Sequence, residues 1–266
     1  LIIAGHFLGF SGDFAASAEV SIQLGAVLAI IAHERKRLAL LIGQTIRERR
    51  DIAAMIGARR GASWSSVLRS SLASHRNFRF LIGLGLAFLP VAALGLLTHD
   101  WIERHLFTPQ TVAATSIIGG LIILAVEARR GQARVHELEQ VGLTSVFWIG
   151  VAQCASLLPG MSRSGSTIVG GLYAGLDRKV ATEYSFFLAL PTLITATCYQ
   201  MWTSREQFQQ EGYLALAVGI LVSFAVAWLV IAAFLAFVKR HTLRPFAYYR
   251  ILMGAVVFYI FGLQQG

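Results

Sequence analysis

The chain has 266 residues, of which 56% are hydrophobic and only 14% are charged, and its mean hydropathy is +0.63. Soluble globular domains carry about 25% charged residues, so this composition excludes an ordinary soluble protein and predicts a membrane protein with several spans. The net charge of +9 would suit nucleic acid. The basic residues lie between apolar segments, however, where membrane orientation explains them, so we expect no nucleic-acid partner.

The first residues read LIIAGHFLGF and lack the basic region and cleavage site of a signal peptide. We interpret them as the end of an apolar element that begins upstream of Leu1. The lone His6 in this stretch is better explained as a packed or interfacial ring than as a site residue. Cys154 and Cys198 lie in apolar segments without metal-like spacing, so we expect both to be packed thiols.

Transmembrane helices need about 20 predominantly apolar residues to cross a hydrocarbon core of ~30 Å. Six segments of the chain meet this requirement and are predicted to span the membrane: 14–33, 80–98, 111–128, 181–202, 213–238 and 246–263. Segment 141–176 is also apolar, but Pro159-Gly160 and a polar stretch interrupt it. Because such backbone is tolerated at membrane depth only inside protein or a wet cavity, we predict a re-entrant helical hairpin there.

The distribution of basic residues supports this topology. Connection 34–79 carries eleven Lys and Arg residues, and smaller basic groups lie at 129–134, 178–179 and 239–244. The links 99–110 and 203–212 have only Arg104 and Arg205. If 141–176 is re-entrant, every basic connection falls on one face, as the positive-inside rule requires; a single crossing would place two of them on the other face.

The basic connection 34–79 includes the stretch GARRGASWSSVLRSSL. This stretch either holds a surface helix on anionic headgroups or is a solvated cytoplasmic loop, and we assign it no chemistry.

The chain contains a weak internal repeat. DFAASAEVSIQLG at 13–25 and DRKVATEYSFFLA at 177–189 share the pattern D-x5-E-x-S-x2-L at an offset of 164 residues. The predicted topology gives the two copies opposite orientations, which is typical of inverted-repeat proteins with a site near the midplane. We therefore predict one all-α membrane domain with repeat units at about 1–128 and 129–266. The offset places a first hairpin loop just upstream of Leu1, giving two re-entrant hairpins in all.

The interruption in 141–176 reads PGMSRSGST at 159–167. An arginine in the membrane is costly and is usually functional, and its guanidinium suits phosphate oxygens. A helix that begins after Pro159-Gly160 would add backbone N–H groups, and Ser162, Ser164, Ser166 and Thr167 would add hydroxyls. We predict an anion cradle around Arg163. The alternative is a capped helix start with close packing by small residues and an Arg163–carboxylate pair.

Three further polar residues are candidates for the site. Glu19 and Glu183 could be metal ligands, a base or partners of Arg163, or they could be interfacial charges. Gln153 could line the site or pack against the other hairpin. His33, His75, His99, His105, His136 and His241 lie in or beside loops and are discounted.

The stretch PGMSRSGST resembles the PGxSRSxxT signature of the undecaprenyl-diphosphatase (BacA/UppP) family. GHFLGFSGD, EVSIQLGAVLAI, FLPVAALGLL and TEYSFFLALPT extend the likeness over essentially the whole chain. The resemblance implies an integral membrane phosphatase of the bacterial inner membrane that converts undecaprenyl diphosphate to the monophosphate. That reaction recycles the carrier for peptidoglycan synthesis and confers bacitracin resistance. The implied fold has two inverted units, and the implied active site opens to the periplasmic face.

The resemblance also implies roles for individual residues. Arg163 and Ser162 would be catalytic, and Gly160, Ser164 and Thr167 would contact the substrate; we include Gln153, Glu183 and Glu19 as further substrate-binding candidates. A divalent cation, Mg or Ca, is implied as well. Its ligands, together with a serine and a histidine, belong to a family segment of the form ExxxEFLPVSSTGH that would end just before Leu1.

Two other functions are considered. A PAP2-type lipid phosphatase needs a histidine six residues after the arginine, where this chain has Val169. A polyprenyl-phosphate flippase could use the same anion cradle without chemistry.

Overall fold

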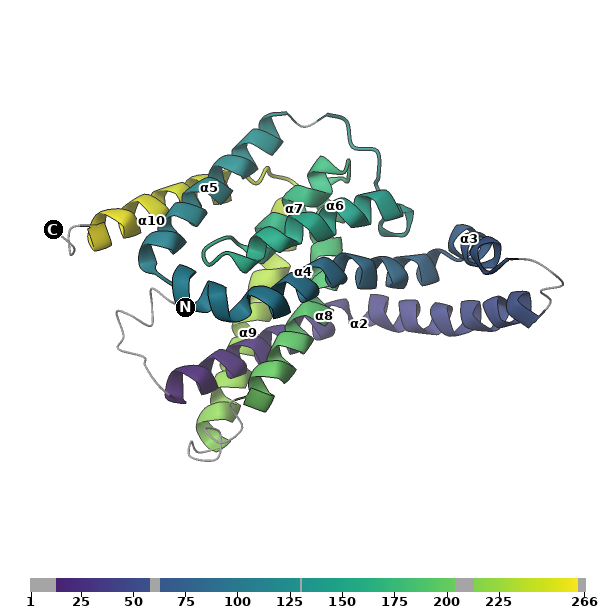
Figure 1. Ribbon diagram of the computed structural model, residues 1–266, viewed down its shortest axis with the longest axis horizontal. Coiled ribbons are helices and arrows are strands. Elements are labelled where there is room, and N and C mark those ends of the chain that lie inside the picture. The colour runs from purple at the N-terminus through teal and green to yellow at the C-terminus, as the bar shows by residue number, and fades with distance from the viewer. Residues whose placement is uncertain (1–12, 58–62, 130, 204–212, 263–266) are drawn as a thin grey trace.

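The computed structural model describes residues 13–57, 63–129, 131–203 and 213–262. The elements in this part of the chain are helical (Figure 1), which confirms the predicted all-α class. The helices are α2 (Asp13–Gly57), α3 (Trp64–Ser74), α4 (Arg76–Leu106), α5 (Pro109–Ala128), α6 (Leu143–Cys154), α7 (Arg163–Tyr173), α8 (Arg178–Thr203), α9 (Tyr213–Val238) and α10 (Arg244–Gly262). Two short 3-10 helices, η1 (Leu138–Gln140) and η2 (Ala155–Leu157), flank α6.

Each of the six predicted spans lies in one of the long helices. Of the described helices, α4, α5 and residues 216–238 of α9 are long and apolar enough to cross a membrane on their own. Large apolar side chains are exposed along all of these helices, as expected of surfaces that face lipid. The structure thus agrees with a helical membrane protein, and the count of six spans stays a prediction.

Helix α2 is longer than the sequence predicted. The expected span ended at residue 33 and a loop was to follow, whereas the helix continues to Gly57 and α4 begins at Arg76. Residues 34–57 contain no proline and are rich in Leu, Ala, Ile, Arg and Glu, which favour helix even outside a membrane. The Glu48 carboxylate also accepts hydrogen bonds from the backbone N–H groups of Asn77 and Phe78, joining α2 to the start of α4.

The arginine-rich connections meet at one end of the bundle. Arg37 of α2 contacts Glu183 of α8 at 2.6 Å, and Arg79 of α4 donates to the Glu139 carbonyl at 2.9 Å. In a second group, Arg178 forms a two-bond pair with the buried Glu127 carboxylate, which also accepts the backbone N–H of Leu243. The predicted grouping of the basic connections is therefore correct, and we refer to this end as the basic end.

The opposite end carries aromatic residues on two helices. His99 of α4 and Tyr199 of α8 are in edge contact at 6.0 Å between ring centroids, and Trp101 and Trp202 are exposed nearby along their helices. The rise from Arg79 to Trp101 along α4 is about 33 Å at ~1.5 Å per residue, close to the thickness of a hydrocarbon core. Basic residues at one end and aromatic residues at the other are typical of a membrane-spanning bundle.

Segment 141–176 folds as the predicted helix–loop–helix hairpin. Ser145 near its start donates to the carbonyl of Ala174 near its end, so both ends lie together. The arms approach closely because a Cβ on Gly170 would lie 2.5 Å from the Cβ of Ala152. The Glu127–Arg178 pair joins the residues before and after the segment, so the chain leaves the basic end at Glu127 and has returned to it by Arg178.

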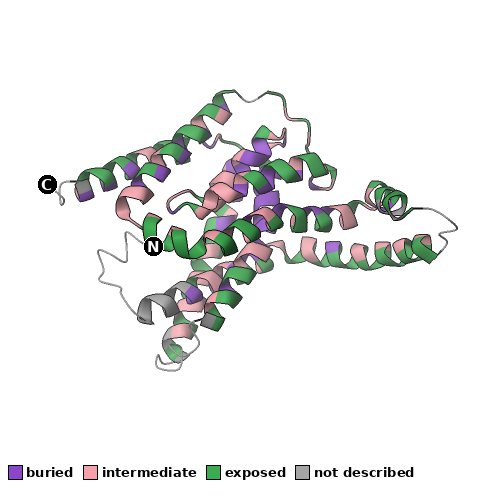
Figure 2. Ribbon diagram, viewed as in Figure 1, coloured by how far each residue is buried: buried purple, intermediate pink, exposed green. Residues whose placement is uncertain are grey.

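The core lies where this hairpin meets α4 and α8. Figure 2 shows buried residues gathered around α6, α7 and α8, whereas much of the outer helix surface is exposed. Phe80 makes edge contacts with Tyr184 and Phe187 at 5.7 and 5.4 Å between centroids. Gly150 allows α6 to approach α4 closely, because a Cβ there would lie 2.9 Å from the Ala87 carbonyl oxygen. This packing fixes the hairpin against the bundle.

Helices α2 and α8, which carry the two segments of the predicted repeat, pack antiparallel. Arg37 contacts Glu183 near one end, and Thr197 donates to the Gln23 side chain at 3.0 Å near the other. This orientation is the one that an inverted repeat requires.

The prediction for the cysteines was wrong for one of them: Cys154 is partly buried, but Cys198 is exposed on α8. An apolar neighbourhood in the sequence does not distinguish a lipid-facing position from a packed one.

Candidate functional site

The loop between the hairpin arms is held by α5. Thr115 donates a short hydrogen bond to the Pro159 carbonyl, and Ser116 lies 3.4 Å from the Gly160 carbonyl. Gly160 has φ +88°, and a Cβ there would also clash with the Thr115 hydroxyl and with the Val112 carbonyl. Gly160 therefore shapes the loop through its conformation and its close contact with α5, and only glycine fits both conditions.

Arg163, the predicted anion-binding residue, begins α7 at this loop. Its Nη1 donates to the carbonyl oxygen of Ala189 on α8 at 3.2 Å. Within the described part of the chain, no carboxylate pairs with this guanidinium. None of the described carboxylates is thus the partner that the alternative interpretation required, and the Glu19 carboxylate lies outside the described residues. The guanidinium has five N–H donors, so four remain to bind an anion.

The loop lies at an intermediate depth in the bundle. Ala189 is about 16 Å along α8 from Arg178 at the basic end, given a rise of ~1.5 Å per residue. Thr115, which holds Pro159, is about 18 Å along α5 from Glu127 by the same measure. Both helices thus place the loop about half the thickness of a ~30 Å hydrocarbon core away from the basic end.

The hydroxyl groups of the loop have different roles. Ser162 is the N-cap of α7 and accepts the backbone N–H of Gly165 at 3.1 Å, which leaves its own O–H free to donate. The Ser164 hydroxyl makes no hydrogen bond with any described residue. Ser166 donates to the Ser162 carbonyl. The helix start is therefore capped, as the alternative interpretation expected. The hydroxyls of Ser162 and Ser164 can still donate to a ligand.

Thr167 differs from its predicted role. Its side chain is buried, and its hydroxyl lies 2.6 Å from that of Ser185 on α8. It also lies 3.0 Å from the Arg163 carbonyl oxygen. Thr167 lies one turn along α7 from Arg163, on the same side of the helix, and its hydroxyl contacts α8. In this structure Thr167 joins α7 to α8, which holds Arg163 in place.

Gln153 is fully buried at the end of α6. Its Nε2 lies 3.5 Å from the Thr192 hydroxyl, and its Oε1 has no hydrogen-bond partner among the described residues. Thr192 is one turn along α8 from Ala189, which binds Arg163. Gln153 and Arg163 thus contact successive turns of α8. Gln153 Oε1 and four N–H donors of Arg163 thus lie in the interior without a described hydrogen-bond partner. Unpaired polar groups in the interior are costly and usually functional.

The structure places Glu183 away from the Arg163 loop. Glu183 is paired with Arg37 at 2.6 Å and with Lys179 at 3.9 Å, and so belongs to the basic end rather than to the loop. Of the roles considered for Glu183, these contacts fit the interfacial charge, and the pairing with Arg163 is not present. Glu19 lies in α2, but its side chain is outside the described residues, as is His6. Among the described residues there is no group of three or more His, Cys, Asp or Glu side chains that could hold a metal ion.

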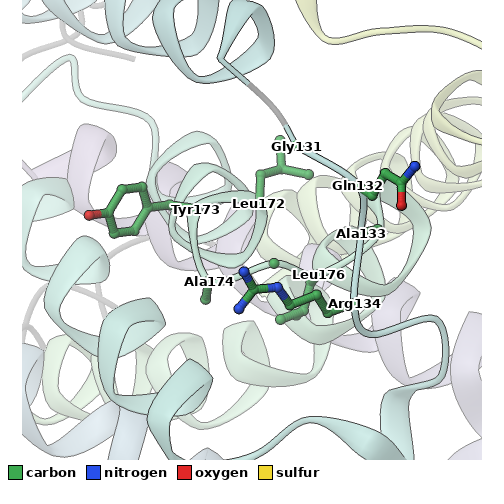
Figure 3. A pocket seen from close by; sticks show the side chains of 9 residues that line it. Gly131, Gln132, Ala133, Arg134, Leu172, Tyr173, Ala174 and Leu176 are labelled. Atoms are coloured by element: carbon green, nitrogen blue, oxygen red, sulfur yellow. The ribbon is translucent and has the colours of Figure 1, made fainter.

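A pocket of about 190 Å³ lies at the base of the hairpin (Figure 3). It is formed by residues 131–134 and by the end of α7 with the turn after it, residues 172–176. Backbone bonds from Arg134 and Val135 to the Gly175 carbonyl form one wall. Because these residues are at the basic end, this pocket is separate from the Arg163 loop.

A second arginine, Arg250, lies at the loop and was not among the predicted site residues. Nη2 of Arg250, in the middle of α10, donates to the Gly160 carbonyl at 3.1 Å. A Cβ on Gly165 would lie 3.0 Å from Nη1 of the same guanidinium, so Arg250 stands beside the first turn of α7. Its position as a lone arginine inside the predicted span 246–263 could have identified it as a site residue, because ionisable residues within spans are usually functional.

Comparisons with known proteins show the family of this chain. The family model described as "Bacitracin resistance protein BacA" matches residues 1–256. An undecaprenyl-diphosphatase from Caldanaerobacter subterraneus subsp. tengcongensis is 39% identical, over 98% of this chain and 87% of the relative. Those from Dechloromonas aromatica and Sorangium cellulosum are 38% and 40% identical, over 97% and 98% of this chain and 84% and 78% of the relatives. With its SRS loop and a match over nearly its whole length, the chain belongs to the BacA family of bacitracin resistance proteins.

Proposed function

We propose that this protein hydrolyses undecaprenyl diphosphate to undecaprenyl phosphate and inorganic phosphate. Relatives that carry the name undecaprenyl-diphosphatase match nearly the full chain. The observation that carries the proposal is Arg163, whose guanidinium lies deep in the bundle with one carbonyl contact and no described carboxylate partner. Such a group suits an anionic headgroup attached to a membrane lipid. By regenerating the monophosphate carrier, the reaction would support peptidoglycan synthesis and confer bacitracin resistance.

The proposed setting is the bacterial inner membrane, with the basic end on the cytoplasmic face. The six long apolar segments would span the bilayer, and the α6–α7 hairpin would enter from the basic end and return to it. Helices of 12 and 11 residues rise about 18 and 16 Å, so each arm reaches only about halfway across. The loop at the hairpin tip would then open toward the periplasmic face. The antiparallel arrangement of α2 and α8 supports the two-unit inverted repeat.

In the proposed reaction Arg163 holds the phosphoryl group that is transferred. Two parallel N–H donors of the guanidinium would bind non-bridging oxygens and offset the charge that gathers on them. At the start of α7 the Gly165 N–H is bound by Ser162, whereas the N–H groups of Arg163 and Ser164 have no partner within the helix and would add donors from the same side. The hydroxyls of Ser162 and Ser164 would donate from the loop. Phosphoryl transfer depends mainly on such positioning and electrostatic stabilisation.

Arg250 would act beside Arg163 as a second positive charge. Its contact with the Gly160 carbonyl uses one of its five donors, and its position near Gly165 directs the rest to the start of α7. A diphosphate carries two phosphoryl groups, so two guanidinium groups at one loop match its charge better than one. We assign Arg250 to binding of the diphosphate, and Gln153 to the interior wall of the site.

A divalent cation, Mg or Ca, remains part of the proposal because the sequence resemblance implies it. The described residues do not provide a set of carboxylate and histidine ligands for it. We therefore route no step of the reaction through the metal. The Glu19 side chain remains a proposed contributor, and Glu183 would support the fold at the basic end.

The proposal is tested by phosphate release from undecaprenyl diphosphate with the protein purified in detergent. We expect multiple turnovers with undecaprenyl phosphate as the lipid product. A lipid carrier that used the same loop would bind the diphosphate and liberate no phosphate, and that result would overturn the proposal.

A further inference from the structure

Helices α5 and α10 lie side by side (Figure 1), and glycines allow their backbones to approach closely. A Cβ on Gly120 of α5 would lie 2.8 Å from the Ala247 carbonyl oxygen of α10. A Cβ on Gly254 of α10 would lie 2.7 Å from the Ala113 carbonyl oxygen of α5. Small residues at such contacts let two membrane helices pack backbone against backbone, so these two glycines serve helix packing.

Gly119, in the middle of α5, has a different kind of neighbour. The atoms nearest to a Cβ at this position would be Nη2 and Cζ of Arg250, the latter at 2.8 Å, and Sδ of Met161 at 2.9 Å. All three atoms are at the ends of flexible side chains, and none belongs to a backbone. The missing side chain at 119 therefore leaves room for the Arg250 guanidinium rather than for a neighbouring helix.

A second glycine borders the same guanidinium. A Cβ on Gly165, in the first turn of α7, would lie 3.0 Å from Arg250 Nη1 and 3.3 Å from the Ser162 hydroxyl oxygen. At the loop, Nη2 donates to the Gly160 carbonyl at 3.1 Å. The guanidinium is thus flanked by Gly119 of α5 and Gly165 of α7, close to the Ser162 hydroxyl.

Glycine at position 119 is not the residue that the helix itself would favour. Glycine inside a helix is less favourable than alanine, because it loses more backbone freedom on folding. An alanine at 119 would meet only side-chain ends, which can swing aside at little cost to the fold. Helix α5 would therefore accept alanine, and the group that alanine would displace is the Arg250 guanidinium.

We propose that Gly119 is a positioning residue that keeps the Arg250 guanidinium against the hairpin loop, where it binds the diphosphate. A Cβ at 119 would move Nη2 off the Gly160 carbonyl and carry the guanidinium away from Ser162. Helix α5 would thus contribute to substrate binding, although its one charged residue, Glu127, lies at the basic end. This inference rests on the proposed role of Arg250 in the phosphatase reaction.

The test compares Gly119→Ala with Arg250→Gln and with the double variant, by phosphate release from undecaprenyl diphosphate in detergent. The matched control is Gly85→Ala, because Gly85 lies in the apolar helix α4 with open space around its Cβ position. Binding of an isoprenoid methylenediphosphonate, in which CH₂ replaces the bridging oxygen, is measured on the same proteins and requires no turnover. Thermal unfolding shows whether each variant is folded.

We expect Gly119→Ala to raise KM, and the dissociation constant of the analogue, about 10-fold with a smaller effect on kcat, as for Arg250→Gln. The double variant should bind no more weakly than Arg250→Gln alone, because both changes remove the same contact. The melting temperature of Gly119→Ala should equal or exceed that of the wild type, since alanine favours helix. Gly85→Ala should leave KM unchanged.

An unchanged KM in Gly119→Ala, together with a raised KM in Arg250→Gln, would overturn the inference. Additive effects in the double variant, an equal rise of KM in Gly85→Ala or a clearly lowered melting temperature of Gly119→Ala would also overturn it, since each assigns Gly119 to helix packing alone. If the wild type binds the analogue but releases no phosphate from the substrate, the proposed function fails, and the effect of Gly119→Ala on analogue binding still decides this inference.

Discussion

Arg163→Ala gives the sharpest test of the proposed site, because the structure predicts opposite effects on activity and stability. Arg163 uses one of its five donors on the Ala189 carbonyl and leaves four for the substrate. Removing one preorganised donor to a charged transition state typically lowers kcat by about 10²–10³-fold. We therefore expect phosphate release to fall at least ~100-fold. Arg163→Lys keeps the charge but not the two-bond geometry, so we expect it to recover only part of the loss.

The same substitution should hardly affect folding. It removes one hydrogen bond to Ala189, worth about 1 kcal/mol, and also removes an interior charge that has no described carboxylate partner. We expect the thermal unfolding midpoint to be unchanged or slightly raised. The control is Arg134→Ala, an exposed arginine at the base of the same hairpin, which should keep full turnover.

Phosphate release from undecaprenyl diphosphate in detergent measures the activity, and melting of the same samples measures the stability. If Arg163→Ala retained more than about a tenth of wild-type turnover, Arg163 would not be the phosphoryl clamp. A loss of activity together with a large fall in melting temperature would instead assign Arg163 a structural role.

Three further predictions concern residues around the loop and at the basic end. Glu127→Ala leaves Arg178 without its buried partner, so we expect it to destabilise the protein by about 3–5 kcal/mol, measured by unfolding in detergent, with activity per folded molecule retained. Gly160→Ala forces a side chain into φ +88° against Thr115; we expect a loss of about 1–3 kcal/mol in stability together with most of the activity, and wild-type behaviour would contradict the loop geometry. Arg250→Gln should raise KM for the diphosphate about 10-fold or more with a smaller effect on kcat, because it removes a charge that binds substrate and transition state alike; an unchanged KM would remove Arg250 from the site.

The sequence predicted the main features of the fold because they depend on local chemistry and on charge. Apolar segments long enough to span a membrane give helices, and Pro159-Gly160 interrupts the one segment that turns back. The distribution of arginines predicted which connections share an end, and the Glu127–Arg178 pair confirms that grouping. The SRS stretch predicted the position of the loop, and Ser162 as the helix cap follows from the same local pattern.

Other features were not accessible from the sequence. A basic segment after an apolar one was interpreted as a loop, whereas α2 continues through it because it packs on α4 through Glu48. Cys198 was expected inside and is exposed, because lipid-facing and buried positions are both apolar in a membrane helix. Glu183 has the same local pattern as Glu19, but Arg37 binds it at the basic end.

The sequence alone therefore determined the class, the position of the hairpin and the identity of its arginine, since hydrophobic length and residue type fix these locally. Only the tertiary structure decided which groups surround that arginine. Ala189, Arg250 and Thr115 come from three helices distant in the chain. Their convergence depends on how those helices pack, and helix packing is set by many weak contacts between similar apolar surfaces that no single stretch of sequence specifies.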